Sequence, residues 1–166
     1  MRHRRLRWIV LCGLLGLASP ASADGISGTY VRKGSNAAFL IQIVETADGH
    51  LTGRFEQVIL QPDGKLDDMD ATIVGAADVQ TVAVTIKPAA LLAGSLAASG
   101  TVQGTLLHLT GGGNGANLIL NLLKSDEVNF RAQVAMLTEQ GRQIDKARAR
   151  QDAAQCQAKI ETDQLT

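Results

Sequence analysis

A period-two alternation of apolar and polar residues, repeated in short segments over residues 26–123, constrains this chain more than any other feature. Such alternation is typical of strands with one buried face, because successive side chains of a strand point to opposite sides. Within residues 50–60, for example, Leu51 and Phe55 fall on one face and Arg54 falls on the other. Residues 26–123 are therefore predicted to form β-sheet.

Turn signals separate these segments at short, regular intervals. Asp48-Gly49 follows an apolar, β-branched run and predicts a hairpin with a type I′ turn, whose two central positions prefer positive φ. In residues 61–65, QPDGK, proline and glycine occupy positions that a tight turn favours. The segments between the predicted strands are too short for the long crossover connections that parallel strands need. The spacing predicts a mainly β domain of seven or eight antiparallel strands, either an up-and-down barrel or a sandwich.

A glycine-rich stretch at residues 111–115 raises the question of a phosphate-binding loop, which lies between a strand and the N-terminus of a helix. The segment after the glycines has leucine at positions 118, 120 and 122, which is strand periodicity. We therefore expect a hairpin loop here.

The pattern changes to helical after residue 124. The sequence SDEV, residues 125–128, reads as a helix N-cap followed by acidic residues. An apolar stripe then follows with helical spacing. It comprises Phe130, Val134, Leu137, Gly141 and Ile144. This stripe is expected to pack on the sheet or to close one end of it. Residues 24–124 are thus predicted to form the barrel-like domain, and residues 125–166 a C-terminal helix and polar tail.

Beyond Ile144 the helix becomes polar. Ala147, Ala154 and Ala158 could mark a weak coiled-coil seam, through which the chain would oligomerise; the alternative is a solvated, fraying tail.

The first 23 residues are typical of a secretory signal peptide. Four arginines precede an apolar run of eleven residues, Trp8 to Ala18, and ASA precedes Asp24. The run is shorter than the roughly 20 residues that a membrane-spanning helix needs. The alternatives are an uncut membrane anchor or lipid modification at Cys12. The protein is expected to be periplasmic or secreted.

Without this segment the chain carries 12 basic and 16 acidic residues, a net charge of −4. Such a charge argues against nucleic acid as a partner, since binding it needs a basic patch. One cysteine remains, Cys156, so we expect no disulfide within the chain and consider one between two tails.

The residues that could carry chemistry do not converge in the sequence. A calcium loop formed by Asp63, Asp67, Asp68 and Asp70 would not have the usual ligand spacing, so a solvated turn is favoured. His50 and His108 are too few for a zinc site and have no nucleophile motif nearby. No metal, cofactor or catalytic residue is expected.

Two asparagines, Asn117 and Asn121, share a strand face opposite the leucines. If that face points into a barrel they could bind a ligand; if it points outward they contact solvent.

Residues 26–56 resemble the first hairpins of the avidin and streptavidin family of small secreted barrels. Gly28 and Tyr30 match that family's Gly-x-Trp strand, Ser35 its Gly-Ser-x turn, and Thr52-Gly53 its following strand. The resemblance implies a barrel of that general shape and makes Ser35 a candidate ligand-binding residue. The departures concern the biotin pocket: no tryptophan follows residue 23, and Phe55 replaces the ligand-binding tyrosine.

Taken together, these features predict an exported, non-catalytic binding protein. Its ligand would be a small apolar molecule inside the barrel, or a protein partner held by the helical tail. The alternatives are an envelope assembly protein that oligomerises through residues 125–166, and a small secreted hydrolase.

Overall fold

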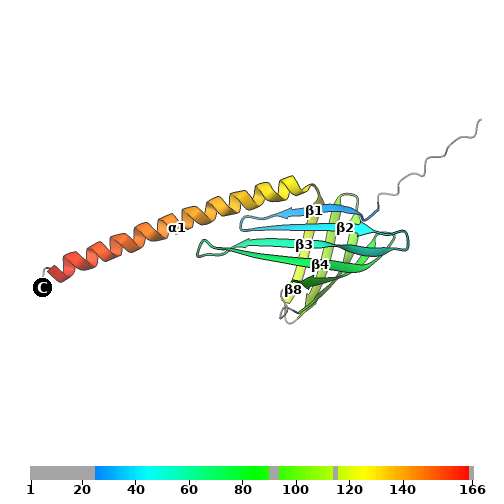
Figure 1. Ribbon diagram of the computed structural model, residues 1–166, viewed down its shortest axis with the longest axis horizontal. Coiled ribbons are helices and arrows are strands. Elements are labelled where there is room, and N and C mark those ends of the chain that lie inside the picture. Colours follow the sequence, from blue (N-terminus) through cyan, green and yellow to red (C-terminus); the bar gives the residue numbers. More distant parts are fainter. Residues whose placement is uncertain (1–24, 90–93, 114–115, 165–166) are drawn as a thin grey trace, which may run out of the picture.

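The structure, a computed structural model, describes residues 25–89, 94–113 and 116–164. Within these residues it contains eight β-strands followed by one long α-helix (Figure 1). The strands are β1 (Gly28–Lys33), β2 (Ala37–Glu45), β3 (His50–Leu60), β4 (Leu66–Asp78), β5 (Thr81–Pro88), β6 (Leu96–Gln103), β7 (Leu106–Gly113) and β8 (Ala116–Lys124), and the helix is α1 (Glu127–Gln164).

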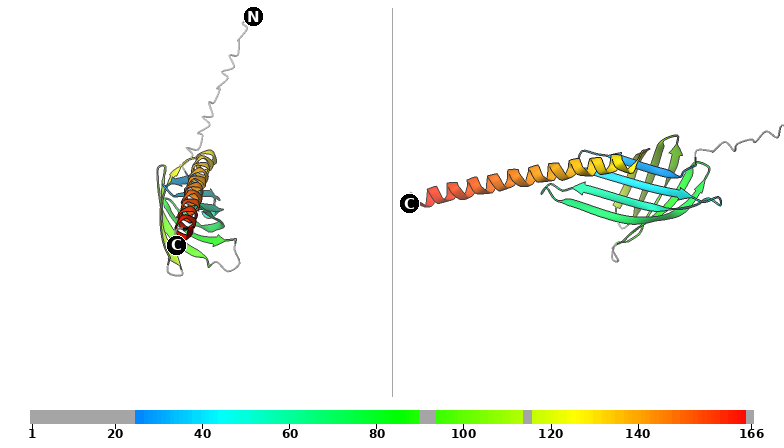
Figure 2. Two further views of the ribbon diagram at one scale, coloured as in Figure 1. Left: turned by 90° about the vertical axis from the view of Figure 1, so that its left-hand side faces the viewer. Right: turned by 45° about the horizontal axis from the view of Figure 1, so that its top comes forward.

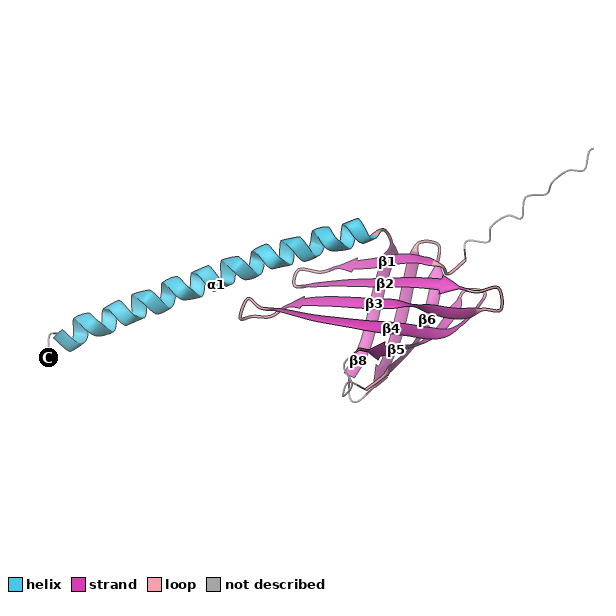
Figure 3. Cartoon of the chain, in the orientation of Figure 1, coloured by secondary structure: helices cyan, strands magenta, loops and turns pink. Residues whose placement is uncertain are grey.

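The eight strands form a closed barrel in which each strand pairs antiparallel with the next along the chain, and β8 pairs with β1 (Figure 3). The longest ladder joins β3 to β4 from His50↔Ala76 to Leu60↔Leu66. The predicted mainly β class is confirmed, and of the two architectures left open by the sequence the barrel is the correct one.

Two hairpins have the same turn chemistry. Gly49 donates its N–H to the carbonyl of Thr46, and Gly64 donates to that of Gln61, both at 2.9 Å. Both glycines have positive φ, +78° and +88°, whereas Asp48 does not. These are three-residue loops in which a turn is followed by a left-handed glycine. The predicted hairpin at Asp48-Gly49 is therefore confirmed, but the predicted type I′ turn is wrong.

The glycine-rich stretch also lies between neighbouring strands. The ladder between β7 and β8 runs from Leu106↔Leu123 to Gly113↔Ala116, so both flanking segments are antiparallel strands, as predicted. Residues 114–115 lie outside the described part of the chain.

The barrel interior is filled with side chains. One buried cluster draws residues from all eight strands and comprises Ile26, Tyr30, Ile41, Ile43, Leu51, Phe55, Ala71, Ile73, Val82, Val84, Ile86, Ala98, Val102, Leu107, Leu109, Leu120 and Leu122. The Tyr30 hydroxyl donates to the carbonyl of Ile26 at 2.8 Å, which satisfies a polar group inside the cluster. Burial of the ring raises the pKa of Tyr30, and the charge of Glu45 adds to this. The interior is thus a packed core.

A second buried cluster lies on the outside of the barrel, beneath α1. It comprises Val31, Ala38, Leu40, Val58, Leu60, Phe130 and Leu137. Helix α1 therefore runs along the outer face of β1, β2 and β3, and it continues well past the end of the barrel (Figure 2). Of the two placements expected for the helical stripe, packing on the sheet is correct and closing one end of it is not.

The predicted signal peptide, residues 1–23, lies outside the described residues. In the part of the chain that the structure describes, no helix combines the length and the apolar character needed to cross a membrane.

Candidate functional site

The start of α1 is held by its N-cap. Asp126 Oδ1 accepts a hydrogen bond from the backbone N–H of Asn129 at 2.8 Å, and another from the Asn129 side chain at 3.0 Å. The cap is therefore Asp126, one residue later than the SDEV pattern suggests. A carboxylate at this position accepts a hydrogen bond from one of the free N–H groups of the first turn. Its negative charge also interacts favourably with the positive end of the helix dipole.

The first half of α1 is fixed to the barrel by its apolar stripe. Phe130 and Leu137 are fully buried against the second cluster, while Val134 and Ile144 pack at its margin. These residues belong to the stripe predicted from helical spacing, so that prediction is confirmed. Gln133, also buried, donates to the carbonyl of Gly34 in the β1–β2 turn at 2.8 Å.

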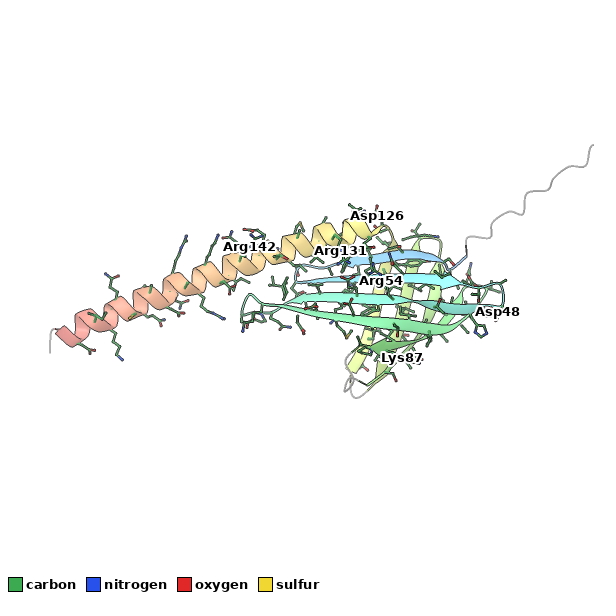
Figure 4. The ribbon with its side chains drawn as sticks, in the orientation of Figure 1. Asp48, Arg54, Lys87, Asp126, Arg131 and Arg142 are labelled. Carbon is green, nitrogen blue, oxygen red and sulfur yellow. The ribbon has the colours of Figure 1, made fainter. Side chains whose placement is uncertain are left out.

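An alternating chain of charges reinforces this docking. Arg131 makes a two-point ion pair with Glu56 of β3, whose side chain is only 12% exposed. Arg131 also pairs with Glu127 at 3.0 Å, and Glu127 pairs with Arg54 of β3 at 2.8 Å. Figure 4 shows Arg54 and Arg131 where the first turns of α1 meet the sheet. Arg54 in turn donates to Gln42 of β2 at 2.8 Å, so the network ties the helix to two strands.

The ion pairs shift the pKa values of two members. Hydrogen bonds from Arg131 and Arg54 hold the pKa of Glu127 below its usual range. The hydrogen bond to Glu56 is the largest cause that raises the pKa of Arg131. Both groups are therefore charged at neutral pH, as the network requires.

The contact between α1 and the β3–β4 turn marks the end of the docked part. A Cβ atom on Gly141 would lie 2.3 Å from the carbonyl oxygen of Gly64, so only glycine allows this approach. About two turns further along, Arg148 reaches the carbonyl of Asp63 at 3.5 Å. The docked half of α1 therefore extends from Glu127 to Arg148.

Residues 149–160 of α1 project beyond the barrel, and every side chain among them is exposed (Figure 1). An apolar line with four-three-four spacing runs along them. It comprises Ala149, Ala153, Cys156 and Ile160, and we call it the outer stripe. Ile160, 53% exposed, is the large apolar side chain of this line. At 100° per residue, the outer stripe lies about 110° around the helix from the face that contacts the barrel.

The outer stripe differs from the seam suggested by the sequence. Ala147 lies near the end of the docked half, and Ala154 and Ala158 lie on the projecting half. All three are on the opposite flank from the outer stripe and include no large apolar side chain. The four-three-four spacing that ends at Ile160 was the signal that could have identified the outer stripe from the sequence.

The residues proposed from the sequence as ligand contacts do not form one group. Asn121 lies on the outer surface of β8, with its Oδ1 atom 2.5 Å from Nδ1 of His108, and lines a pocket beside β1. Asn117 is exposed on β8, where it pairs with Gly112 of β7. Ser35 is exposed in the β1–β2 turn. Both asparagines thus lie on the outward face, while the leucines of β8 point into the core.

The other candidates lie on the surface. His50 is exposed and 3.4 Å from Asp48 in the β2–β3 hairpin. Asp63 is in the β3–β4 turn, and Asp67, Asp68 and Asp70 are exposed along β4. In the described ranges of the chain, no three histidine, cysteine or acidic residues gather in a way that could hold a metal ion.

Comparisons with known proteins returned no match: no family model, no curated protein and no solved structure matches this chain.

Proposed function

We propose that the protein is an exported, non-catalytic binding protein in which the barrel is a scaffold and the projecting half of α1 is the binding element. Its partner is a second helix, supplied by another copy of the same chain. The observation that carries this proposal is the outer stripe, an apolar line on the part of α1 that projects beyond the barrel.

The packed interior supports a site on the helix over one inside the barrel. Small barrels hold a ligand only when side chains leave space for it. Here the interior cluster includes large, fully buried side chains from β2 to β8, such as Ile41, Ile73 and Leu120. A small ligand in the barrel would have to displace this core.

The energetics of a projecting helix also favour a partner. Isolated helices shorter than about 12–15 residues are marginal in water, because most helix stability in proteins comes from packing of one face. Residues 149–160 are attached to a docked helix, which removes the cost of nucleation, but their side chains are exposed. A second helix on the outer stripe would supply the missing packing.

Parallel pairing in register fits the stripe. It places each residue opposite its own copy, so Ile160 packs on Ile160 and Cys156 faces Cys156. Because the outer stripe is turned away from the docked face, a second helix can lie along it without meeting the barrel.

The residues beside the stripe are compatible with the same pairing. Asp145 and Asp152 flank one side of the line, and Arg150 and Gln157 flank the other. In a parallel pair, a residue on one flank meets the residue five positions later on the opposite flank of the partner helix. Asp145 then meets Arg150, and Asp152 meets Gln157, so neither of these two pairs brings like charges together.

The experiment compares two substitutions on opposite sides of the projecting helix. The molar mass of the chain lacking residues 1–23 is measured by light scattering over a range of concentrations. Ile160→Asp buries a charge in the proposed seam and should abolish dimerisation, whereas Gln151→Asp, on the far side of the helix, should leave it unchanged. A wild-type protein that stays monomeric up to about 100 µM, well above the Kd of a pair with micromolar affinity, overturns the proposal. Equal effects of the two substitutions overturn it as well.

A further inference from the structure

The barrel is incompletely paired where it closes. β1 and β8 share two residue pairs, Tyr30↔Lys124 and Val31↔Leu123, after which the strands diverge. Arg32 bridges the gap by donating from Nη1 to the carbonyl oxygen of Ile119 at 3.1 Å. This divergence leaves a depression between the two strands on the outside of the barrel.

A pocket of about 410 Å³ occupies this depression, next to the first turn of α1. Its lining residues come from β1, β8 and the start of the helix: Val31, Arg32, Lys33, Asn121, Leu123, Lys124, Ser125 and Asn129. We call it the closure pocket. Its volume lies in the range of small-molecule sites, about 300–1,000 Å³.

Three basic residues line the closure pocket and no acidic residue does, although the Lys124 side chain extends towards Gly28, where a Cβ atom would lie 3.7 Å from its Nζ. Among the residues described, Arg32, Lys33 and Lys124 take part in no ion pair. Lys33 donates to Oδ1 of Asn129 at 2.9 Å, an uncharged partner. The nearby carboxylate of Asp126 caps the helix through Asn129 and is not part of the lining. The pocket therefore concentrates positive charge on a chain whose residues 24–166 are net negative.

The remaining lining is apolar or uncharged. Leu123, 58% exposed, and Val31 contribute apolar surface, and Ile119, 62% exposed, extends it along the outward face of β8. Amide groups of Asn121 and Asn129 lie beside the cations. Cations next to exposed aliphatic side chains match a ligand with an anionic head and an apolar body.

We propose that the closure pocket binds a small soluble amphiphile with a carboxylate, sulfonate or phosphate head. The head is held by Lys33 and by Arg32, whose guanidinium uses one N–H on Ile119 and keeps others for an anion. The apolar body lies against Leu123 and Ile119. This site is separate from the projecting helix and does not depend on the function proposed for it.

The test uses a matched pair of fluorescent dyes with the full chain lacking residues 1–23. Anilinonaphthalene sulfonate carries a sulfonate, and phenyl-naphthylamine is the same ring system without it. The sulfonate dye should bind with a stoichiometry of one per chain, and the neutral dye should bind far more weakly. Soluble decanoate should displace the bound dye, and vesicles of phosphatidylglycerol should not.

Charge variants locate the site. Lys33→Gln should weaken binding of the sulfonate dye about tenfold, since it removes a charge-assisted contact. Lys87→Gln removes the same charge from an exposed position outside the pocket and should have little effect. Ser125→Glu, which adds a carboxylate to the lining, should abolish binding without loss of barrel circular dichroism.

Three results would overturn the inference. They are equal affinity for the two dyes, equal effects of the Lys33 and Lys87 substitutions, and displacement by vesicles but not by decanoate.

Discussion

Arg131 on the second turn of α1 and Glu56 on β3 form a two-point ion pair across 75 residues of sequence. Glu56 is largely covered by the helix, and the same arginine also holds Glu127. This relationship joins the first turns of the helix to β3 of the barrel.

Replacing Arg131 by glutamine should lower the free energy of unfolding by about 1–2 kcal/mol, because it leaves the mostly buried Glu56 carboxylate with only the longer, 3.9 Å ion pair to Arg54. Urea unfolding followed by circular dichroism measures the change. Arg142→Gln is the matched control: its partner Glu139 lies three residues away on the same exposed helix face, and such pairs contribute about 0.2–0.5 kcal/mol. A loss at Arg131 no larger than at Arg142 would contradict the role of the network.

The stability of the docked helix should depend on Glu127 in acid. The folded-state pKa of Glu127 is held below the usual value by Arg131 and Arg54. The stabilisation that ionised Glu127 provides is therefore complete above the ordinary glutamate pKa of about 4.3. It is lost as the pH falls through the lower pKa of Glu127 in the folded protein. Between about pH 5 and pH 3 the wild-type protein should lose more stability than Glu127→Gln, measured as urea midpoints. The lowered pKa values of Asp48, Asp63 and Glu139 act equally in both proteins and cancel. Parallel pH profiles would show that Glu127 contributes nothing.

Gly141→Ala should destabilise the protein although alanine is the better helix former. The added Cβ would meet the Gly64 carbonyl at 2.3 Å and the Leu60 side chain at 3.3 Å, so α1 must move off the β3–β4 turn. Overpacking of this kind costs about 1–3 kcal/mol, against a gain in helix propensity of about 1 kcal/mol. Gln140→Ala, at the exposed neighbouring position, should be neutral or slightly stabilising in the same unfolding assay. A Gly141→Ala variant more stable than wild type would mean that the helix does not approach the turn this closely.

Cys156 should form a disulfide between two chains under mild oxidation, because parallel pairing places the exposed thiol opposite its own copy. Non-reducing electrophoresis measures the fraction of covalent dimer over time. The control moves the thiol to the far side of the helix, as Gln151→Cys combined with Cys156→Ser, and should react far more slowly. Similar rates for the two proteins would rule out the proposed register.

Much of the fold could be read from local periodicity. The alternation of Leu51 and Phe55 with Arg54 and the stripe from Phe130 to Ile144 are local patterns, and each element that they predicted is present. The closed barrel, rather than a sandwich, depends on the pairing of β1 with β8, residues 30–31 with 123–124, and no local pattern encodes that contact.

The docking face of α1 and the closure pocket could not be predicted from the sequence, because both depend on contacts between residues that are far apart along the chain. The side of the sheet that receives α1 follows from Val31, Leu40 and Val58, which look like ordinary strand residues until the helix covers them. The closure pocket brings Lys33 of β1 and Asn121 of β8 together only when the chain closes on itself.

The most direct test of the central claim is sedimentation equilibrium of two proteins, residues 24–166 and residues 24–148, at matched concentrations. The account predicts a reversible dimer for the longer chain and a monomer with an intact barrel spectrum for the shorter one. A longer chain that remains monomeric, or a shorter chain that still dimerises, would contradict it.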